Sequence, residues 1–157
     1  SGSKRIYKDD KVLYKGRYGT LQIIKGDPNH VELNPDCIKI IVNDSDPHEL
    51  LEEWMHRQTK NYVIKKARKY TDKLNISFNN IYVRSMKKWG SCSQKGNLTF
   101  NIYLMALPSK LAEYVVAHEV MHLLEFNHTM RFKHRLEKLC SDIDQREKQL
   151  HTFIPTL

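Results

Sequence analysis

Hydrophobic and polar residues alternate in short runs along residues 1–45. The runs Lys11–Tyr14, Thr20–Ile24, Val31–Leu33 and Ile38–Val42 contain the β-branched and aromatic residues that favour strands. Turn-forming segments separate these runs, namely Gly16 to Gly19, Asp27-Pro28-Asn29 and Asn34-Pro35-Asp36. The pattern predicts a small antiparallel sheet.

The period of the pattern changes after residue 45. Asp46 can cap the first free amides of a helix, and Pro47 suits the first helical position. Apolar residues then recur at helical spacing as far as Leu74. They are Leu50, Leu51, Trp54, Met55, Tyr62, Val63, Ala67, Tyr70 and Leu74. We expect one long helix whose apolar stripe packs against the core.

Shorter elements are predicted after this helix. Two strands are expected at about Ile81–Met86 and Asn97–Leu104, with a turn at Ser93–Gly96 between them. A second helix should begin at Pro108-Ser109 and end near Glu125, and a third should run from about Met130 to Leu150.

Strands separated from helices in this way predict an α+β fold, in which a small antiparallel sheet packs against the long helix and the second helix. We expect one domain over residues 1–157, with a strand-rich part at 1–45 and a helical part with two strands at 46–157.

Composition narrows the class of protein. Hydrophobic residues make up 40% of the 157 residues and charged residues 28%, which is typical of a globular chain and not of a disordered or fibrous one. The chain has no apolar run near the ~20 residues that span a bilayer, and no secretion signal is evident at its start. Its three cysteines, without a C-x-x-C pair, favour a reducing compartment, so we expect a cytoplasmic protein without a membrane partner.

The formal net charge of +8 allows two interpretations. It can belong to a solvated surface, or it can attract nucleic acid. Lys65, Lys69 and Lys73 form a row at helical spacing that fits either interpretation. A nucleic-acid-associated binding module with a structural or inert zinc site therefore stays open as an alternative function, as does a protease recruited to DNA-bound proteins.

The segment Tyr114–His122 contains the pattern H-E-x-x-H inside the second predicted helix. His118 and His122 lie four residues apart, so their imidazoles project from one face of the helix, one turn apart. Two imidazoles in this arrangement can converge on one Zn²⁺ at about 2.0–2.1 Å. Apolar neighbours indicate a largely buried helix, in which unpaired polar side chains would be costly. A shared metal ion would satisfy both histidines.

A catalytic zinc site usually has three protein ligands and one position left for water. His128 is the favoured third ligand, because it follows His122 by six residues and a turn at Phe126-Asn127 would bring it back. His134 is the competing candidate. Because it lies in the third predicted helix, we expect its side chain to lie on the surface or to contact a metal ligand.

Glu119 follows the first predicted ligand directly, so its carboxylate is close to the metal without binding it. In this position it can act as general base for a zinc-activated water and then protonate the leaving amine. The predicted function is zinc-dependent hydrolysis of peptide bonds in a peptide or protein substrate. A zinc hydrolase of another amide or ester fits the same ligands. Tyr114, one turn before His118, is a candidate oxyanion partner or a packed aromatic residue.

Other segments resemble a known family. Residues Arg84–Ser93 read R-S-M-K-K-W-G-S-C-S, which resembles the signature of the YgjP-like metallopeptidases around Trp-Gly-Ser-Cys-Ser. The pattern continues through Gly96–Asn101, Leu104–Pro108, the H-E-x-x-H segment, Asn127-His128 and Phe132. The resemblance covers about Trp54 to Leu139, and Lys88 stands where the family commonly has Arg.

The resemblance implies a minimal gluzincin-like zinc peptidase, related to the SprT-like and WLM groups. Trp89, Asn101, Tyr114 and His134 are candidates for contacts with the substrate or with the metal ligands. Cys92 is a further candidate ligand, although three histidines make it unnecessary. By analogy with gluzincins, we expect the strand at about 97–104 to pair with an extended substrate along its edge.

Overall fold

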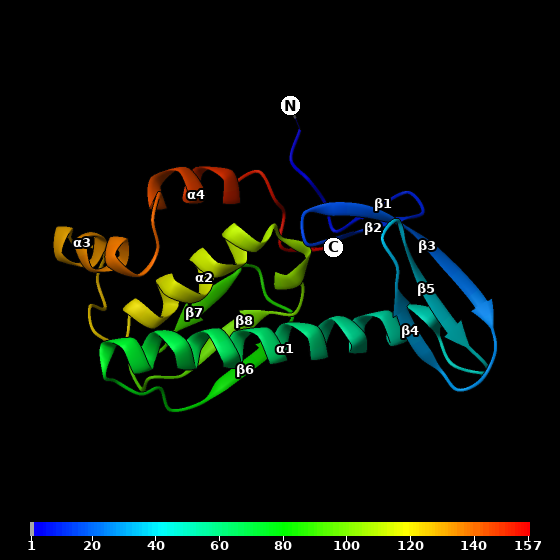
Figure 1. Cartoon of the computed structure of the whole chain (residues 1–157), viewed down its shortest axis with the longest axis horizontal. Helices are drawn as coiled ribbons and strands as arrows, with labels where there is room; N and C mark the ends of the chain where they lie inside the picture. The colour runs from blue at the N-terminus through cyan, green and yellow to red at the C-terminus, as the bar shows by residue number, and fades with distance from the viewer. Residues whose placement is uncertain (1) are drawn as a thin grey trace.

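The structure is a computed structural model that describes residues 2–157. Its most prominent element is the long helix α1 (Pro47–Leu74), which runs past both sheets of the molecule (Figure 1). With 28 residues, α1 is about 42 Å long. Asp46 caps its first turn by accepting from the amide of His48, as expected from the sequence. Six residues of the predicted apolar stripe are buried, whereas Leu50, Tyr62 and Leu74 are half-buried. The stripe joins the two halves of the core.

The N-terminal sheet consists of β1 (Tyr7–Lys8), β2 (Lys11–Tyr14), β3 (Arg17–Lys25), β4 (His30–Leu33) and β5 (Cys37–Val42) in the order β1-β2-β3-β5-β4. All four predicted strands are present. The sheet is mixed and not purely antiparallel, because β3 and β5 pair in parallel. Ile38, Ile40 and Val42 of β5 are buried. This strand therefore takes the interior position, and the more exposed β4 is left at the edge.

The second sheet consists of β6 (Ile81–Arg84), β7 (Gly90–Cys92) and β8 (Leu98–Asn101) in the order β6-β8-β7. Its three-residue strand β7 was not predicted, and the turn at 93–96 joins β7 to β8. Leu98 and Phe100 of β8 are fully buried, so β8 lies in the middle of the sheet. The expectation of a substrate-binding edge on this strand is therefore wrong, and the edge beside α2 belongs to β7.

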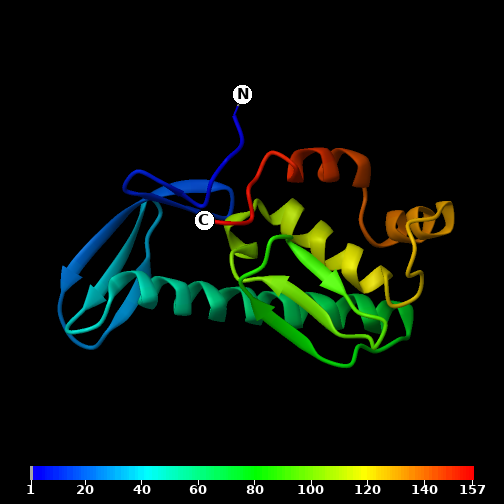
Figure 2. The ribbon, with the colours of Figure 1, turned by 180° about the vertical axis from the view of Figure 1, so that it is seen from behind.

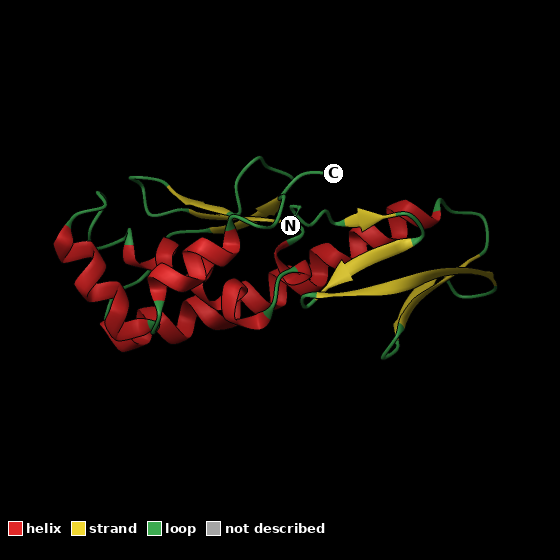
Figure 3. Cartoon of the chain, turned by 90° about the horizontal axis from the view of Figure 1, so that it is seen from above, coloured by secondary structure: helices red, strands yellow, loops and turns green. Residues whose placement is uncertain are grey.

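After β8 the chain forms a short 3-10 helix, η1 (Leu104–Ala106), and then the helices α2 (Ser109–Met121), α3 (Met130–Leu139) and α4 (Ile143–Leu150). The predicted third helix is thus two helices, separated at Cys140–Asp142, where Asp142 adopts a left-handed conformation with φ of 53°. Figure 3 shows the helices on one side of the three-stranded sheet. The predicted α+β class is confirmed.

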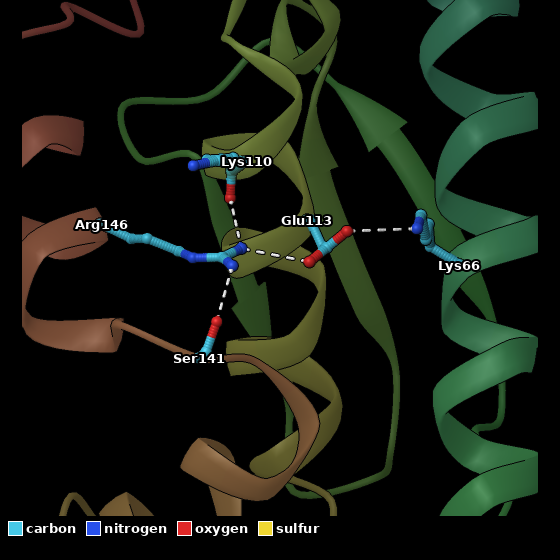
Figure 4. A network of polar contacts seen from close by, with 5 residues as sticks. All are labelled: Lys66, Lys110, Glu113, Ser141 and Arg146. Carbon is cyan, nitrogen blue, oxygen red and sulfur yellow. Dashed lines mark hydrogen bonds and ion pairs between the residues drawn. The ribbon is translucent and has the colours of Figure 1, made fainter.

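A buried arginine holds α4 in place (Figure 4). Arg146 of α4 donates to the carboxylate of Glu113 in α2 at 3.1 Å and to the carbonyl oxygen of Lys110 at 3.1 Å. Glu113 also accepts from Lys66 of α1 at 3.4 Å. Burial alone would raise the pKa of Glu113, but the hydrogen bond from Arg146 and the charge of Lys66 lower it below its ordinary value. The network joins three helices.

The first and last segments of the described chain come together between the two sheets, and the N-terminus projects away from them (Figure 2). Lys4 forms a bridge with Phe153, and its amide and carbonyl groups bond to Thr152 and Ile154. None of the helices described within residues 2–157 is long and apolar enough to cross a bilayer.

Candidate metal centre

Three histidines converge at the carboxyl end of α2. Nε2 of His128 lies 3.0 Å from Nε2 of His122 and 3.1 Å from Nε2 of His118. All three candidate ligand atoms lie within 4.8 Å of one another. The helix places His118 and His122 one turn apart, and the chain after it returns His128 to them. The structure thus brings together the three residues that the sequence predicts as ligands.

The return of the chain is fixed by local interactions. Helix α2 ends at Met121, four residues before the predicted end, and His128 lies just ahead of α3. Thr129 caps α3 by accepting from the amide of Phe132 at 3.2 Å. The ring of Phe132 then packs against all three imidazoles, with centroid distances of 4.5–5.1 Å. This buried aromatic side chain limits how the histidines can rotate.

Two imidazoles are oriented through their Nδ1 atoms. Nδ1 of His122 lies 3.1 Å from the carbonyl oxygen of Glu125, and Nδ1 of His118 lies 3.1 Å from Oε2 of Glu119. If each Nδ1 carries the proton, both Nε2 atoms present lone pairs to the shared centre. Burial, together with the neighbouring His118, lowers the pKa of His122 and so favours its neutral form. Neutral imidazole is the form that binds metals.

Two of the three nitrogen separations are close to those around a tetrahedral metal ion. Ligand nitrogens at about 2.0–2.1 Å from a common centre would lie about 3.3 Å apart, close to the distances of 3.0 and 3.1 Å. Without a cation or a proton between them, three lone pairs this close would repel one another. The donor set, the spacing and the Nδ1 partners therefore suit a divalent metal such as Zn²⁺.

Glu119 lies beside this centre and packs against β7. Its side chain is buried, with 9% exposed. A Cβ placed on Gly90 would lie 3.0 Å from Cγ of Glu119 and 3.2 Å from Cγ1 of Val115. Gly90 therefore lets the edge strand approach the helix closely enough to confine the carboxylate. A glycine within a strand often marks such a close approach, so the sequence did contain a signal for this contact.

The site opens into a cavity of about 510 Å³. His118, Glu119, His122 and His128 line it, together with the whole of β7. Its other lining residues are Lys87, Lys88, Trp89, Tyr114, Val115, Phe126, Glu147, Leu150, His151, Phe153 and Pro155. The last five of these come from α4 and the C-terminal segment, and no pattern in the sequence predicts that these elements lie here. The cavity has the size of a ligand-binding cleft.

The other candidate residues divide into two groups. Tyr114 and Trp89 are buried and line the cavity. Burial, and then the carboxylate of Glu147, raises the pKa of Tyr114, which keeps its phenolic proton. His134 is exposed on α3 and lies outside the histidine cluster. Asn101 is fully buried and does not line the cavity.

Asn101 organises the neighbouring backbone. Its Nδ2 lies 2.9 Å from the carbonyl oxygen of Met86, 3.0 Å from that of Lys88 and 2.9 Å from that of Pro155. Its Oδ1 accepts from the amide of Tyr103 at 2.8 Å, which turns the chain and ends β8 before the predicted boundary. Asn101 thus fixes the loop ahead of β7 and the C-terminal segment, and acts on the cavity through them.

Cys92 lines the cavity but is not part of the histidine cluster. Burial, and then the charge of Glu119, raises the pKa of its thiol to about 11. The thiol is therefore neutral near pH 7. A catalytic zinc site usually has three protein ligands, a number that the three histidines can supply without it.

The fold is similar to that of two metallopeptidase zymogens of known crystal structure. Jannalysin of Methanocaldococcus jannaschii is 26% identical, with a TM-score of 0.51 over 57% of this chain and 93% of jannalysin. Abylysin of Pyrococcus abyssi is 22% identical, with a TM-score of 0.52 over 57% of this chain and 92% of abylysin. At 22% identity, the similarity to abylysin is evidence for a shared fold and for nothing further. No curated protein matches the chain.

A match to a family covers more of the chain than these two structures do. The YgjP-like metallopeptidase domain matches residues 2–153, which include both sheets and all three converging histidines. The resemblance seen in the sequence is confirmed by this match. Membership of a metallopeptidase family implies a metal ion, and the histidine cluster is a place that can hold one. The chain therefore belongs to the YgjP-like metallopeptidase family.

Proposed function

We propose that this chain is a zinc-dependent peptidase in which His118, His122 and His128 hold the metal and Glu119 is the general base. The observation that carries the proposal is the convergence of three imidazole nitrogens within 4.8 Å beside a carboxylate that lines the same cavity. Zinc bound there would acidify a water molecule and polarise the scissile carbonyl group.

The residues of the chain have distinct tasks in this proposal. The Glu119 carboxylate takes a proton from the attacking water and delivers it to the leaving amine. The edge strand β7, which lines the cavity, offers main-chain groups to an extended peptide. The apolar side chains of Trp89 and Phe153 exclude water from one side of the cleft.

The test separates metal binding from catalysis. We expect the purified protein to contain about one zinc ion per chain. The variant Glu119→Gln should keep the zinc and lose peptidase activity by a factor of about 100 or more, because general-base catalysis contributes about 10² to 10⁴. Metal content is measured by elemental analysis and activity with an unfolded protein substrate.

Two further variants complete this experiment. His128→Gln should lower both zinc content and activity, since it removes a predicted ligand. His134→Gln changes an exposed histidine outside the cluster and should change neither. Full activity in Glu119→Gln would show that Glu119 is not the base. Unchanged zinc affinity in His128→Gln would show that the metal is held by other groups.

A further inference from the structure

Two lysines form one side of the entrance to the catalytic cavity. Lys87 and Lys88 line the cavity together with His118 and Glu119, and both lysines are exposed. Within residues 2–157, neither ammonium group lies within ion-pair distance of a carboxylate. Their charges are therefore free to interact with a group that enters the cavity.

The backbone that carries these lysines is held firmly. The fully buried side chain of Asn101 bonds to the carbonyl oxygen of Lys88 at 3.0 Å and to that of Met86 at 2.9 Å. The amide of Asn101 donates to the carbonyl oxygen of Trp89 at 3.0 Å. The side chain of Trp89 is itself buried. The backbone from which both lysines project is thus anchored to the core, so their side chains start from a fixed place at the entrance.

The carboxylates of the cavity occupy other positions. Glu119 is buried next to His118, at 3.1 Å from its Nδ1. Glu147 belongs to α4, close enough to Tyr114 to raise the pKa of that phenol. Charge is therefore distributed unevenly around the cavity, with positive lysines ahead of β7 and a negative carboxylate on the wall formed by α4. An extended substrate would meet different charges along its length.

We propose that Lys87 and Lys88 bind an acidic side chain close to the scissile bond, so that acidic peptide segments are the preferred substrates. The inference rests on the proposed peptidase function, because it assigns the substrate class of the same cavity. An exposed ion pair contributes only modestly, and two together should change affinity and kcat/KM by about tenfold. The preference should weaken at high salt because both lysines face solvent.

The experiment uses three matched peptides that differ at one position near the cleavage site, where they carry Asp, Asn or Lys. We expect wild-type protein to cleave the Asp peptide about tenfold better, in kcat/KM, than the Lys peptide. The double substitution Lys87→Glu and Lys88→Glu should reverse this order. Lys95→Glu is the matched control, because Lys95 is exposed in the 93–96 turn and does not line the cavity.

A binding measurement separates this inference from the function itself. Fluorescence anisotropy with the zinc-loaded Glu119→Gln variant should show about tenfold tighter binding of the Asp peptide than of the Lys peptide, without any turnover. Acid-selective binding combined with no cleavage by wild-type protein would overturn the peptidase proposal and support the acidic preference. Equal binding of the three peptides would overturn the preference, even if all three are cleaved.

Nucleic acid is the competing partner for these charges. Duplex DNA is therefore titrated into the same proteins at low salt. If the double charge reversal abolishes DNA binding and leaves the order of the peptides unchanged, the lysines serve nucleic acid and the proposal is wrong. If it reverses the order of the peptides and leaves DNA binding unchanged, the assignment to acidic peptides is supported.

Discussion

At the scale of single residues, the site depends as much on a missing side chain as on the ones that are present. Gly90 allows β7 to lie against α2 at the level of Glu119. The carboxylate is thereby confined between the strand and His118, with little freedom to turn away from the cavity. In the proposed role of general base, a carboxylate held in this way keeps its orientation without the entropic cost of finding it during each reaction cycle.

The substitution Gly90→Ala tests this confinement. Its new methyl group would lie 3.0 Å from Cγ of Glu119 and 3.3 Å from Cδ1 of Phe100, so the carboxylate must shift. We expect kcat/KM to fall about tenfold, since small displacements of catalytic groups are costly, with zinc content unchanged. Gly19→Ala is the control, because its Cβ would meet only ordinary contacts of 3.6 Å or more. Equal kcat/KM in both variants would contradict the argument.

At the scale of elements, the unit formed by α2, the following loop and α3 is the part that the sequence describes best. Two histidines one turn apart and a third beyond a polar turn are local features, which helical periodicity places without knowledge of the rest. The division between α3 and α4 depends instead on the buried contacts of Arg146 with Glu113. These partners lie 33 residues apart, so the local sequence at Cys140–Asp142 does not predict the break between the two helices.

The strand β7 was missed for a related reason. Its three residues are too few for an alternating pattern, and it forms because β8 supplies a partner and Gly90 fits against α2. The placement of α4 and the C-terminal segment along the cavity is likewise a tertiary effect, since it depends on Asn101 and on the network of Arg146. The convergence of the three histidines was therefore predictable, and the walls of the cleft were not.

The loop that carries His128 is braced by one acidic side chain. Glu125 pairs with Arg131 and with Arg135 of α3, each at 3.4 Å, while its carbonyl oxygen faces Nδ1 of His122. We expect Glu125→Ala to weaken zinc binding by about tenfold, the lower end of the range for residues that orient metal ligands. Competition with a chromogenic chelator measures this change. The control is Glu137→Ala, which changes an exposed residue of α3 and should have no effect on zinc affinity.

At the scale of the whole molecule, stability and catalysis share one set of helices. The Glu113 carboxylate lies between Lys66 of α1 and Arg146 of α4, and so connects the long helix to the wall of the cleft. A neighbouring row of α1 keeps Lys65, Lys69 and Lys73 exposed to solvent. Charge in this protein is thus divided between an internal network and a free surface.

The network should make the fold sensitive to acid. The pKa of Glu113 is lowered in the folded protein below its ordinary value of 4.5. Its stabilising contribution is therefore complete above about pH 4.5 and is lost as the pH falls through the lowered folded-state pKa. We expect Glu113→Gln to reduce the free energy of unfolding at pH 7 and to show a smaller further loss at pH 3 than wild type. Urea unfolding at both pH values measures this.

A surface carboxylate provides the comparison for this prediction. The pair of Asp36 with Arg17 spans 3.8 Å, and both side chains are almost fully exposed. Exposed pairs of this kind contribute little to stability. Asp36→Asn should therefore leave the loss between pH 7 and pH 3 close to that of wild type. An identical pH dependence in Glu113→Gln and wild type would exclude the proposed role of the network.

The bridge between Lys4 and Phe153 has a practical consequence for enzymology. Because Phe153 also lines the cavity, we expect a purification tag or fusion partner joined near either end of the chain to disturb the wall at which substrate would bind. Turnover numbers obtained from differently tagged preparations are then expected to disagree, even when their zinc contents agree. Mounting the protein through a side chain on the far, β3–β4 side would leave that wall undisturbed.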